Sequence, residues 1–315
     1  MDQAYPGGEV KLVFHPAAFN KHGHFGGDDA TRARAFVEFA NDPRLDALWF
    51  ARGGYGSCRI AEAVLPQLNA VARKKRYLGY SDAGSLLALL YKAGFPHVAH
   101  GPMASDGARH EATGRRAVEW LVSGDRASLE ASLLDDPRPA VAFNLTILNE
   151  LVGTALEPDL SGHVIMLEEE SEALYRVDRM VFHLTGQASI RRAAGIRLGR
   201  VSDVTPNDPD FGLTAEEIVR YWCARSGIPY LGAAAIRHDP ADKVVAFGVR
   251  RCVPSSRPSR WQSGAEPGPP KALWVVFLAV PDSGYAASGM TLEGRRYPLK
   301  VRPSGRASKP DRRPR

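Results

Sequence analysis

The sequence predicts an α/β protein with a mostly parallel sheet, and three observations support this fold class. Short apolar runs of strand length alternate with stretches of helical periodicity. Turns rich in glycine and polar residues separate several of these elements. The chain has 315 residues, of which 44% are hydrophobic, and this is enough for a large core and about two domains.

The first half of the chain contains three strand candidates and three helix candidates. Apolar runs at residues 10–14, 46–51 and 77–80 have the length of buried strands, and helical spacing occurs at 28–40, 57–68 and 83–93. The run at 46–51 leads into the turn Gly53-Gly54-Tyr55-Gly56, and the run at 77–80 ends at Ser81. We therefore expect an N-terminal α/β domain over residues 1–135.

The pattern restarts after a stretch rich in Pro and Asp, and we expect a linker at residues 136–141. An apolar segment at 145–151, a strand at 163–167 and a helix at 175–184 follow. Thr214 and Glu217 form a capping-box pattern that predicts the start of a helix at 214–226, and a strand is expected at 228–236. These elements predict a C-terminal domain over residues 142–250.

The net charge of +6 is unevenly distributed along the chain. Residues 250–315 contain 14 Lys+Arg and 4 Asp+Glu, whereas residues 1–249 contain 27 and 31. The same terminal stretch holds ten of the 23 prolines, so we expect residues 251–315 to form an irregular basic tail. Because the body is mildly acidic, the overall charge does not indicate nucleic-acid binding.

The spacing of the cysteines and the length of the apolar runs indicate the cellular compartment of the protein. Cys58, Cys223 and Cys252 form no CxxC pair, so neither a zinc site nor a disulfide framework is predicted. No apolar run approaches the roughly 18–20 residues of a membrane span, and the first ten residues lack the apolar core of a signal peptide. We expect a cytoplasmic protein with no membrane contact, no metal and no cofactor.

The sharpest local motif is Gly79-Tyr80-Ser81-Asp82-Ala83. A serine between a strand and a helix, with small residues two positions away on either side, has the layout of a nucleophile elbow. Ala83 stands where glycine is commoner, so the pattern is incomplete. The alternative is that Ser81 only caps the helix that follows it.

The glycine turn at residues 53–56 suits an oxyanion hole, because glycines allow backbone N–H groups to approach an anion. In a hydrolase, Gly54 would supply one N–H and Asp82 the other. A phosphate-binding turn or a merely tight turn is the alternative. The turn lacks the Lys-Ser/Thr of a P-loop and is not G-x-G-x-x-G.

A serine nucleophile needs a base and an acid behind that base. His238 follows the expected strand at 228–236, which is where catalytic residues of α/β proteins usually occur. An acidic cluster that includes Glu168 lies at the end of the strand at 163–167. Taken alone, such a cluster is either a solvated face or a site, and its residues favour the solvated face.

Five blocks in order resemble the LD-carboxypeptidase family of serine peptidases, which also contains the microcin-immunity peptidases. They are ARGGYGS at 51–57, GYSD at 79–82, HGPM at 100–103, LEEESEALYRVDR at 167–179 and IPYLGAAAIRH at 228–238. The resemblance covers about residues 7–250. It implies that Ser81 is the nucleophile, His238 the general base and Glu168 the orienting acid, with Gly54 and Asp82 forming the oxyanion hole.

The resemblance also implies an architecture and an activity. The N-terminal domain would carry the nucleophile and the C-terminal domain the Glu and the His, with the site at their interface. The expected reaction releases a terminal D-amino acid, such as D-alanine, from murein tetrapeptides during cell-wall recycling. Arg52, Gly53 and Arg237 are the expected substrate-binding residues. The two arginines are candidates because guanidinium groups match carboxylates. A homodimer is a further expectation.

This chain departs from the family pattern at several points. Arg237 stands where the family usually has glycine, and residues 142–146 read AFNLT instead of GGNLS. The first strand and helix of the family have no counterpart at the N-terminus, and residues past Val249 do not resemble it. The alternatives are a catalytically impaired homologue, a peptidase of a microcin-like peptide, or a nucleotide-binding domain that uses the turn at 53–56.

Overall fold

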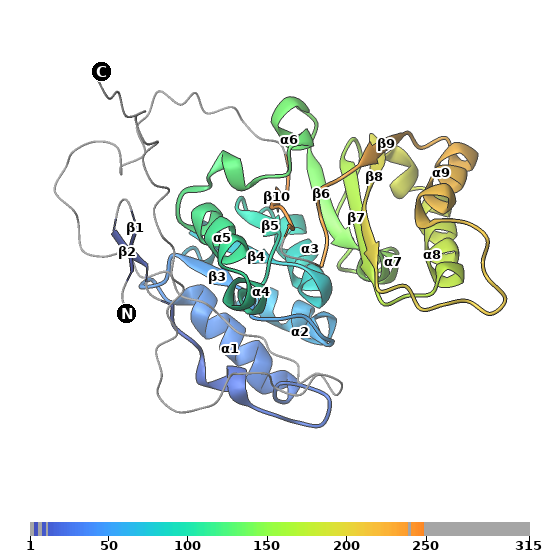
Figure 1. The fold of residues 1–315 in the computed structure, drawn as a ribbon. Helices are drawn as coiled ribbons and strands as arrows, with labels where there is room; N and C mark the ends of the chain where they lie inside the picture. The colour runs from blue at the N-terminus through green and yellow to red at the C-terminus, as the bar shows by residue number, and fades with distance from the viewer. Residues whose placement is uncertain (1–2, 6–7, 11, 239–240, 249–315) are drawn as a thin grey trace, which may run out of the picture.

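The computed structural model describes residues 3–5, 8–10, 12–238 and 241–248. These residues form two α/β lobes, each built on its own four-stranded sheet (Figure 1). The expected basic tail at 251–315 lies outside the described residues.

The first lobe is built on the sheet order β10-β5-β4-β3. Strands β3 (Ala47–Trp49), β4 (Arg76–Gly79) and β5 (Val98–His100) are parallel, and β10 (Val245–Ala246) pairs antiparallel with β5. One face packs against α1 (Asp29–Asn41), α2 (Ser57–Val64) and α3 (Gly84–Lys92), and the other against α4 (Ala104–Arg109) and α5 (Glu111–Ser123). Because neighbouring strand residues point to opposite faces, Leu48 faces the first group of helices and Trp49 the second.

The second lobe is built on a parallel sheet of order β6-β7-β8-β9. Its strands are β6 (Ala140–Asn144), β7 (Val164–Glu170), β8 (Gly195–Ser202) and β9 (Tyr230–Ala233). Its helices are α7 (Leu145–Leu151), α8 (Leu174–Gly186) and α9 (Ala215–Ser226). The remaining regular elements are short: β1 (Gln3–Tyr5), β2 (Gly8–Val10), α6 (Ser132–Asp135) and the 3₁₀ turns at Pro16–Phe19, Leu65–Gln67, Ala72–Lys74, Ser81–Ala83, Arg126–Ser128 and Ile190–Arg192.

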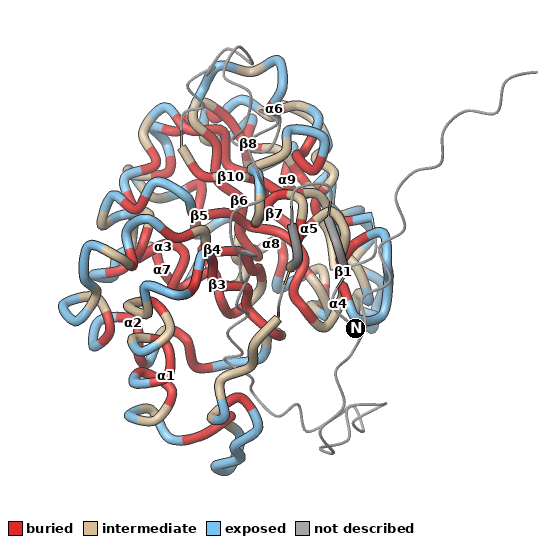
Figure 2. The backbone as a smooth tube through the Cα atoms, turned by 90° about the vertical axis from the view of Figure 1, so that its left-hand side faces the viewer, coloured by how far each residue is buried: buried red, intermediate tan, exposed pale blue. Residues whose placement is uncertain are grey.

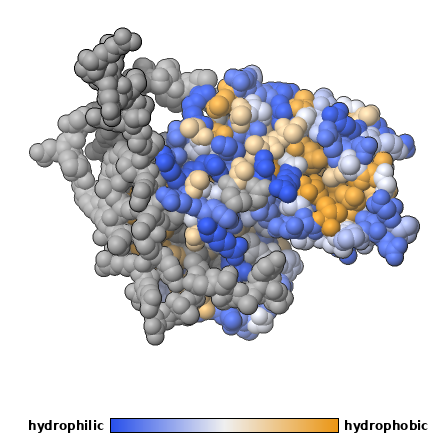
Figure 3. Space-filling model, in the orientation of Figure 1, coloured by the Kyte–Doolittle hydropathy of each residue, from blue (hydrophilic) through white to orange (hydrophobic). Residues whose placement is uncertain are grey.

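The two lobes share one core. The largest apolar cluster combines Leu86 of α3 in the first lobe with Leu148 of α7 and Ile165 of β7 in the second. Figure 2 shows buried backbone running through the middle of the sheets, with exposed residues on the outer helices and loops. Figure 3 shows apolar residues gathered on the visible surface of the second lobe. A shared core of this kind holds the two sheets in a fixed relation and therefore fixes any site that lies between them.

The predicted fold class, α/β with a mostly parallel sheet in the N-terminal domain and a second, C-terminal domain, is confirmed, and the sheet of the second lobe is parallel as well. Each of the five predicted helices is present with its ends shifted by a few residues. As the capping-box pattern predicts, the Glu217 N–H donates to the Thr214 hydroxyl at 3.2 Å and the Thr214 N–H donates to the Glu217 carboxylate at 2.8 Å. The strand expected at 10–14 is wrong for residues 12–14, which have no regular structure. The linker expected at 136–141 runs into β6, and β10 returns to the sheet of the first lobe.

Candidate active site

Ser81 lies at the carboxyl end of β4, directly before α3, in a strained turn. Its φ angle is +52°, a left-handed conformation that non-glycine residues rarely adopt. Strain of this kind persists only where the surrounding structure imposes it, and it is typical of functional turns. Close packing surrounds the turn, because a Cβ added at Gly79 would lie 2.8 Å from the Phe50 ring. This geometry is that of a nucleophile elbow.

The glycine turn after β3 lies directly against Ser81. A Cβ added at Gly53 would come within 2.9 Å of the Ser81 Oγ and 3.1 Å of its Cβ. Gly54 and Gly56 have φ angles of +130° and +115°, which only glycine adopts without strain. The turn therefore uses glycine both for its own path and for its approach to the serine.

The Asp82 side chain fastens the elbow to this turn. Its carboxylate accepts hydrogen bonds from the backbone N–H of Gly56 at 3.1 Å and of Ser57 at 2.9 Å, and the Ser57 hydroxyl donates back to the Asp82 carbonyl. Burial raises the pKa of Asp82, and the two N–H groups oppose this rise because they stabilise the charged carboxylate. Arg32, also buried, donates to the Gly56 carbonyl at 2.9 Å. The turn and the elbow are thus one rigid unit.

Glu168 and His238 form a buried ion pair in the second lobe. Glu168 is fully buried at the end of β7, and its Oε2 lies 2.5 Å from the Nδ1 of His238. His238 follows β9 on a loop that is fastened by Asp242, whose Oδ1 accepts from the Arg237 N–H at 2.9 Å. Arg116 of α5 donates to the Asp242 carbonyl at 2.5 Å, so the first lobe holds this loop as well.

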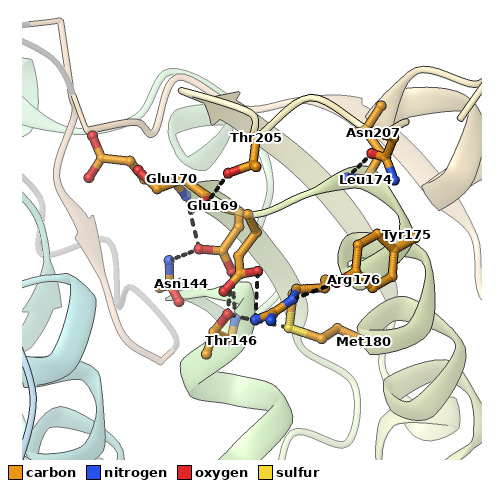
Figure 4. Close-up of polar contacts among 12 residues, drawn as sticks. Asn144, Thr146, Glu169, Glu170, Leu174, Tyr175, Arg176, Met180, Thr205 and Asn207 are labelled. Atoms are coloured by element: carbon orange, nitrogen blue, oxygen red, sulfur yellow. Dashed lines mark hydrogen bonds and ion pairs between the residues drawn. The ribbon is translucent and has the colours of Figure 1, made fainter. Parts of the chain in front are cut away.

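Strand alternation explains why three consecutive glutamates take different roles. Glu168 and Glu170 point to one side of β7, and both have oxygens near His238, at 2.5 Å from Nδ1 and 3.6 Å from Nε2 respectively. Glu169 points to the other side. Its carboxylate accepts from the Asn144 amide at 2.8 Å and from the Thr146 N–H and hydroxyl at 2.8 and 2.7 Å (Figure 4). Glu169 therefore braces β7 against the start of α7.

The ion pair shifts the pKa of both partners. Burial lowers the pKa of His238, but the adjacent Glu168 carboxylate outweighs it and raises the pKa to about 9. Burial raises the pKa of Glu168, and the charged imidazole, with the help of His100, lowers it to about 2. At neutral pH the resting pair is therefore a carboxylate beside an imidazolium.

Tyr80, which directly precedes Ser81, contacts His238. The Tyr80 and His238 rings have centroids 4.4 Å apart in an edge-to-face arrangement. Among the hydrogen bonds of the described residues, none joins Ser81 to His238. A proton can pass between them only once such a hydrogen bond forms, and catalytic hydrogen bonds often tighten only when the substrate is bound.

The other predicted site residues adjoin the serine turn, the glycine turn or His238 in the chain. Arg52 precedes the glycine turn and is half-buried, and Arg237 directly precedes His238. Gly54 lies within the turn, and the backbone N–H of Asp82 follows Ser81 in the elbow. No contact in the structure assigns a substrate to any of them.

Sequence reasoning missed two side chains that complete the site. His100, at the end of β5, is buried, and its Nε2 lies 3.8 Å from the second oxygen of Glu168. Asp106 is close enough to Tyr80 for a hydrogen bond to its phenol, and it lies near His238. The HGPM block begins with His100, so the signal was present in the sequence, but nothing there indicated a partner for that histidine.

The described residues show neither a metal-binding cluster nor a membrane-spanning helix. No group of three or more His, Cys, Asp or Glu side chains within residues 3–248, gaps excepted, has an arrangement suited to a metal ion. No helix in that part of the chain is long and apolar enough to span a bilayer.

The sequence matches both halves of one peptidase family. Residues 4–101 match the LD-carboxypeptidase N-terminal domain, and residues 139–253 match the LD-carboxypeptidase C-terminal domain. The chain belongs to the LD-carboxypeptidase family. This confirms the predicted family and the predicted enzyme class, a serine-type peptidase.

Individual relatives of this LD-carboxypeptidase agree with that assignment. It is 27% identical over 259 residues to a Bacillus subtilis protein named "Probable murein peptide carboxypeptidase", covering 77% of this chain and 78% of the relative. It resembles the crystal structure of a muramoyltetrapeptide carboxypeptidase from Oxalobacter formigenes with a TM-score of 0.60 and 22% identity, covering 77% and 95% of the two chains. The microcin C7 self-immunity protein has a TM-score of 0.62, 17% identity and coverages of 76% and 82%. The two structural likenesses show a shared fold.

Proposed function

We propose that this protein hydrolyses the amide bond that joins a terminal D-amino acid, such as D-alanine, to a murein tetrapeptide. One observation supports the chemistry most strongly. A strained serine turn is built against a glycine turn, and Tyr80, which precedes Ser81, contacts the imidazole of a buried carboxylate–imidazole pair. The names of the Bacillus and Oxalobacter proteins support the substrate class.

In the proposed mechanism, Ser81 Oγ attacks the scissile carbonyl while its proton passes to Nε2 of His238. Glu168 keeps the ring oriented and stabilises the imidazolium that forms. The backbone N–H groups of Gly54 and Asp82 would hold the tetrahedral oxyanion. The C–N bond then breaks, and the imidazolium returns its proton to the leaving amine of the D-amino acid.

Deacylation repeats these steps with water as the nucleophile. Water attacks the Ser81 ester, its proton passes to His238, and that proton then returns to the Ser81 oxygen as the shortened peptide leaves. The proposal also assigns Arg52, Gly53 and Arg237 to the substrate, with a guanidinium paired to the terminal carboxylate.

A labelling experiment tests the nucleophile. A fluorophosphonate probe should attach to Ser81, with the site located by peptide mass spectrometry. Labelling should disappear in Ser81→Ala and fall strongly in His238→Ala, because the serine then lacks its base. Ser85→Ala, on the buried face of α3, is a matched serine control and should leave labelling intact. Labelling of another residue, or none in folded protein, would contradict the assignment.

Hydrolysis of a microcin-like peptide is the second candidate function. The name of the microcin C7 self-immunity protein, which shares this fold, supports this second substrate class. A competition assay separates the candidates: an aminoacyl sulfamoyl nucleotide should inhibit a microcin-type enzyme at concentrations that leave a murein-type enzyme active.

Three broader expectations stay with this proposal. The first is a division into domains at 1–135 and 142–250. The second is a cytoplasmic site of action. The free thiols of Cys58 and Cys223 support it, because a reducing compartment keeps cysteines unpaired. The third is a homodimer, for which the mass in solution, measured by light scattering, is the test.

A further inference from the structure

The structure assigns Glu170 a role at the nitrogen of His238 that must face the nucleophile, an inference that rests on the proposed function. We propose that Glu170 is a positioning residue, which holds Nε2 of His238 in the free enzyme and sets the pH range in which the imidazole can act as a base. Its Oε2 lies 3.6 Å from Nε2, while Nδ1 is already occupied by Glu168 at 2.5 Å.

The geometry makes Glu170 and Ser81 compete for the same nitrogen. An imidazolium held by a carboxylate at each nitrogen is stabilised in its charged form. A general base must be neutral, with Nε2 directed at the serine hydroxyl. Glu170 therefore favours the inactive form of the free enzyme, and its hold must weaken before Ser81 can transfer its proton.

Titratable groups from several elements surround the imidazole. Glu168 and Glu170 come from β7, Asp106 from α4, Asp242 from the loop after His238, and His100 reaches the same cluster through Glu168. Among the described residues, Glu170 alone places a carboxylate oxygen within 4 Å of Nε2. Burial raises the pKa of Glu170, and the nearby His238 charge opposes this rise.

Removal of this charge should shift the pH response of His238. An opposite charge at this distance typically shifts a pKa by 1–3 units, and the Glu170 side chain is 37% exposed, so we expect the lower end of that range. In Glu170→Gln, the His238 pKa should fall by about one unit. The acid limb of kcat/KM should move down by the same amount, giving about a tenfold gain at pH values below the limb.

The experiment measures the His238 pKa and the pH profile in the same proteins. NMR of histidine-labelled wild type, Glu170→Gln and Glu170→Ala gives the pKa without turnover, with His238→Gln to assign the resonance. Glu62→Gln, exposed on α2, removes the same charge elsewhere and should leave both readings unchanged. Glu170 is partly exposed and its side chain accepts none of the hydrogen bonds described, so both variants should fold.

The outcomes separate this inference from the proposed function. A fall in the His238 pKa with a matching shift of the acid limb supports the inference. An unchanged His238 pKa overturns it, whether or not the wild type cleaves the peptide. A lower His238 pKa with an unmoved acid limb in an active enzyme also overturns it, because the imidazole would then not limit the rate.

Discussion

Replacement of Gly53 by alanine tests whether the glycine turn is shaped around the nucleophile. The added Cβ would lie 2.9 Å from the Ser81 Oγ, whereas the optimal separation of non-bonded heavy atoms is about 3.5–4.0 Å. Either Oγ or the turn must therefore move by roughly 0.5–1 Å. Gly53 has no positive φ, so the alanine backbone itself is unstrained. Displacement of a reacting atom by about 1 Å can cost roughly 100-fold in rate.

We therefore expect Gly53→Ala to lower kcat/KM for D-alanine release by about 100-fold. The free energy of unfolding should change by less than about 1 kcal/mol, because the clash involves a side chain that can turn aside. Gly186→Ala is the matched control, since a Cβ there meets nothing within 4 Å, and it should keep full activity. A Gly53→Ala enzyme with wild-type kcat/KM would refute the assignment of this turn to the site.

Two further predictions concern stability. Asp82→Ala leaves the buried N–H groups of Gly56 and Ser57 without their acceptor. The free energy of unfolding, measured with urea, should therefore fall by about 2–3 kcal/mol. A loss under about 0.5 kcal/mol would show that the Asp82 carboxylate does not fasten the elbow to the glycine turn. Because the folded pKa of His238 is raised to about 9, the native state binds more protons than the unfolded state above pH 6.5, and stability should fall as pH rises from 6.5 to 9. Glu168→Gln should flatten that fall in urea titrations at several pH values, and an equally steep fall in the variant would show that another group causes it.

The sequence predicted the elements that depend on local periodicity. The helices at 28–40 and 214–226 have both an apolar face and a capping residue, and both form. The elbow at Ser81 was readable because its flanking residues must be small where strand and helix pack closely. The separation of Glu168 from Glu169 was also accessible in principle, since alternation along β7 sends the two side chains to opposite faces.

Features that depend on contacts distant in sequence could not be predicted. The Asp82 carboxylate binds N–H groups 25 and 26 residues away, and the sequence analysis used only its backbone. Strand β10 is two residues long and returns to β5 across the whole second lobe, so no local pattern reveals it. The glutamate cluster was interpreted as a solvated face because His238 and His100, which contact Glu168, come from distant parts of the chain.

The most direct test of the account is release of D-alanine from a murein tetrapeptide. Purified wild type and Ser81→Ala would be assayed together on peptides that differ only in a terminal D- or L-alanine. The account predicts release by the wild type from the D-terminated peptide alone and none by Ser81→Ala. Equal release by both proteins, or no release by well-folded wild type, would contradict it.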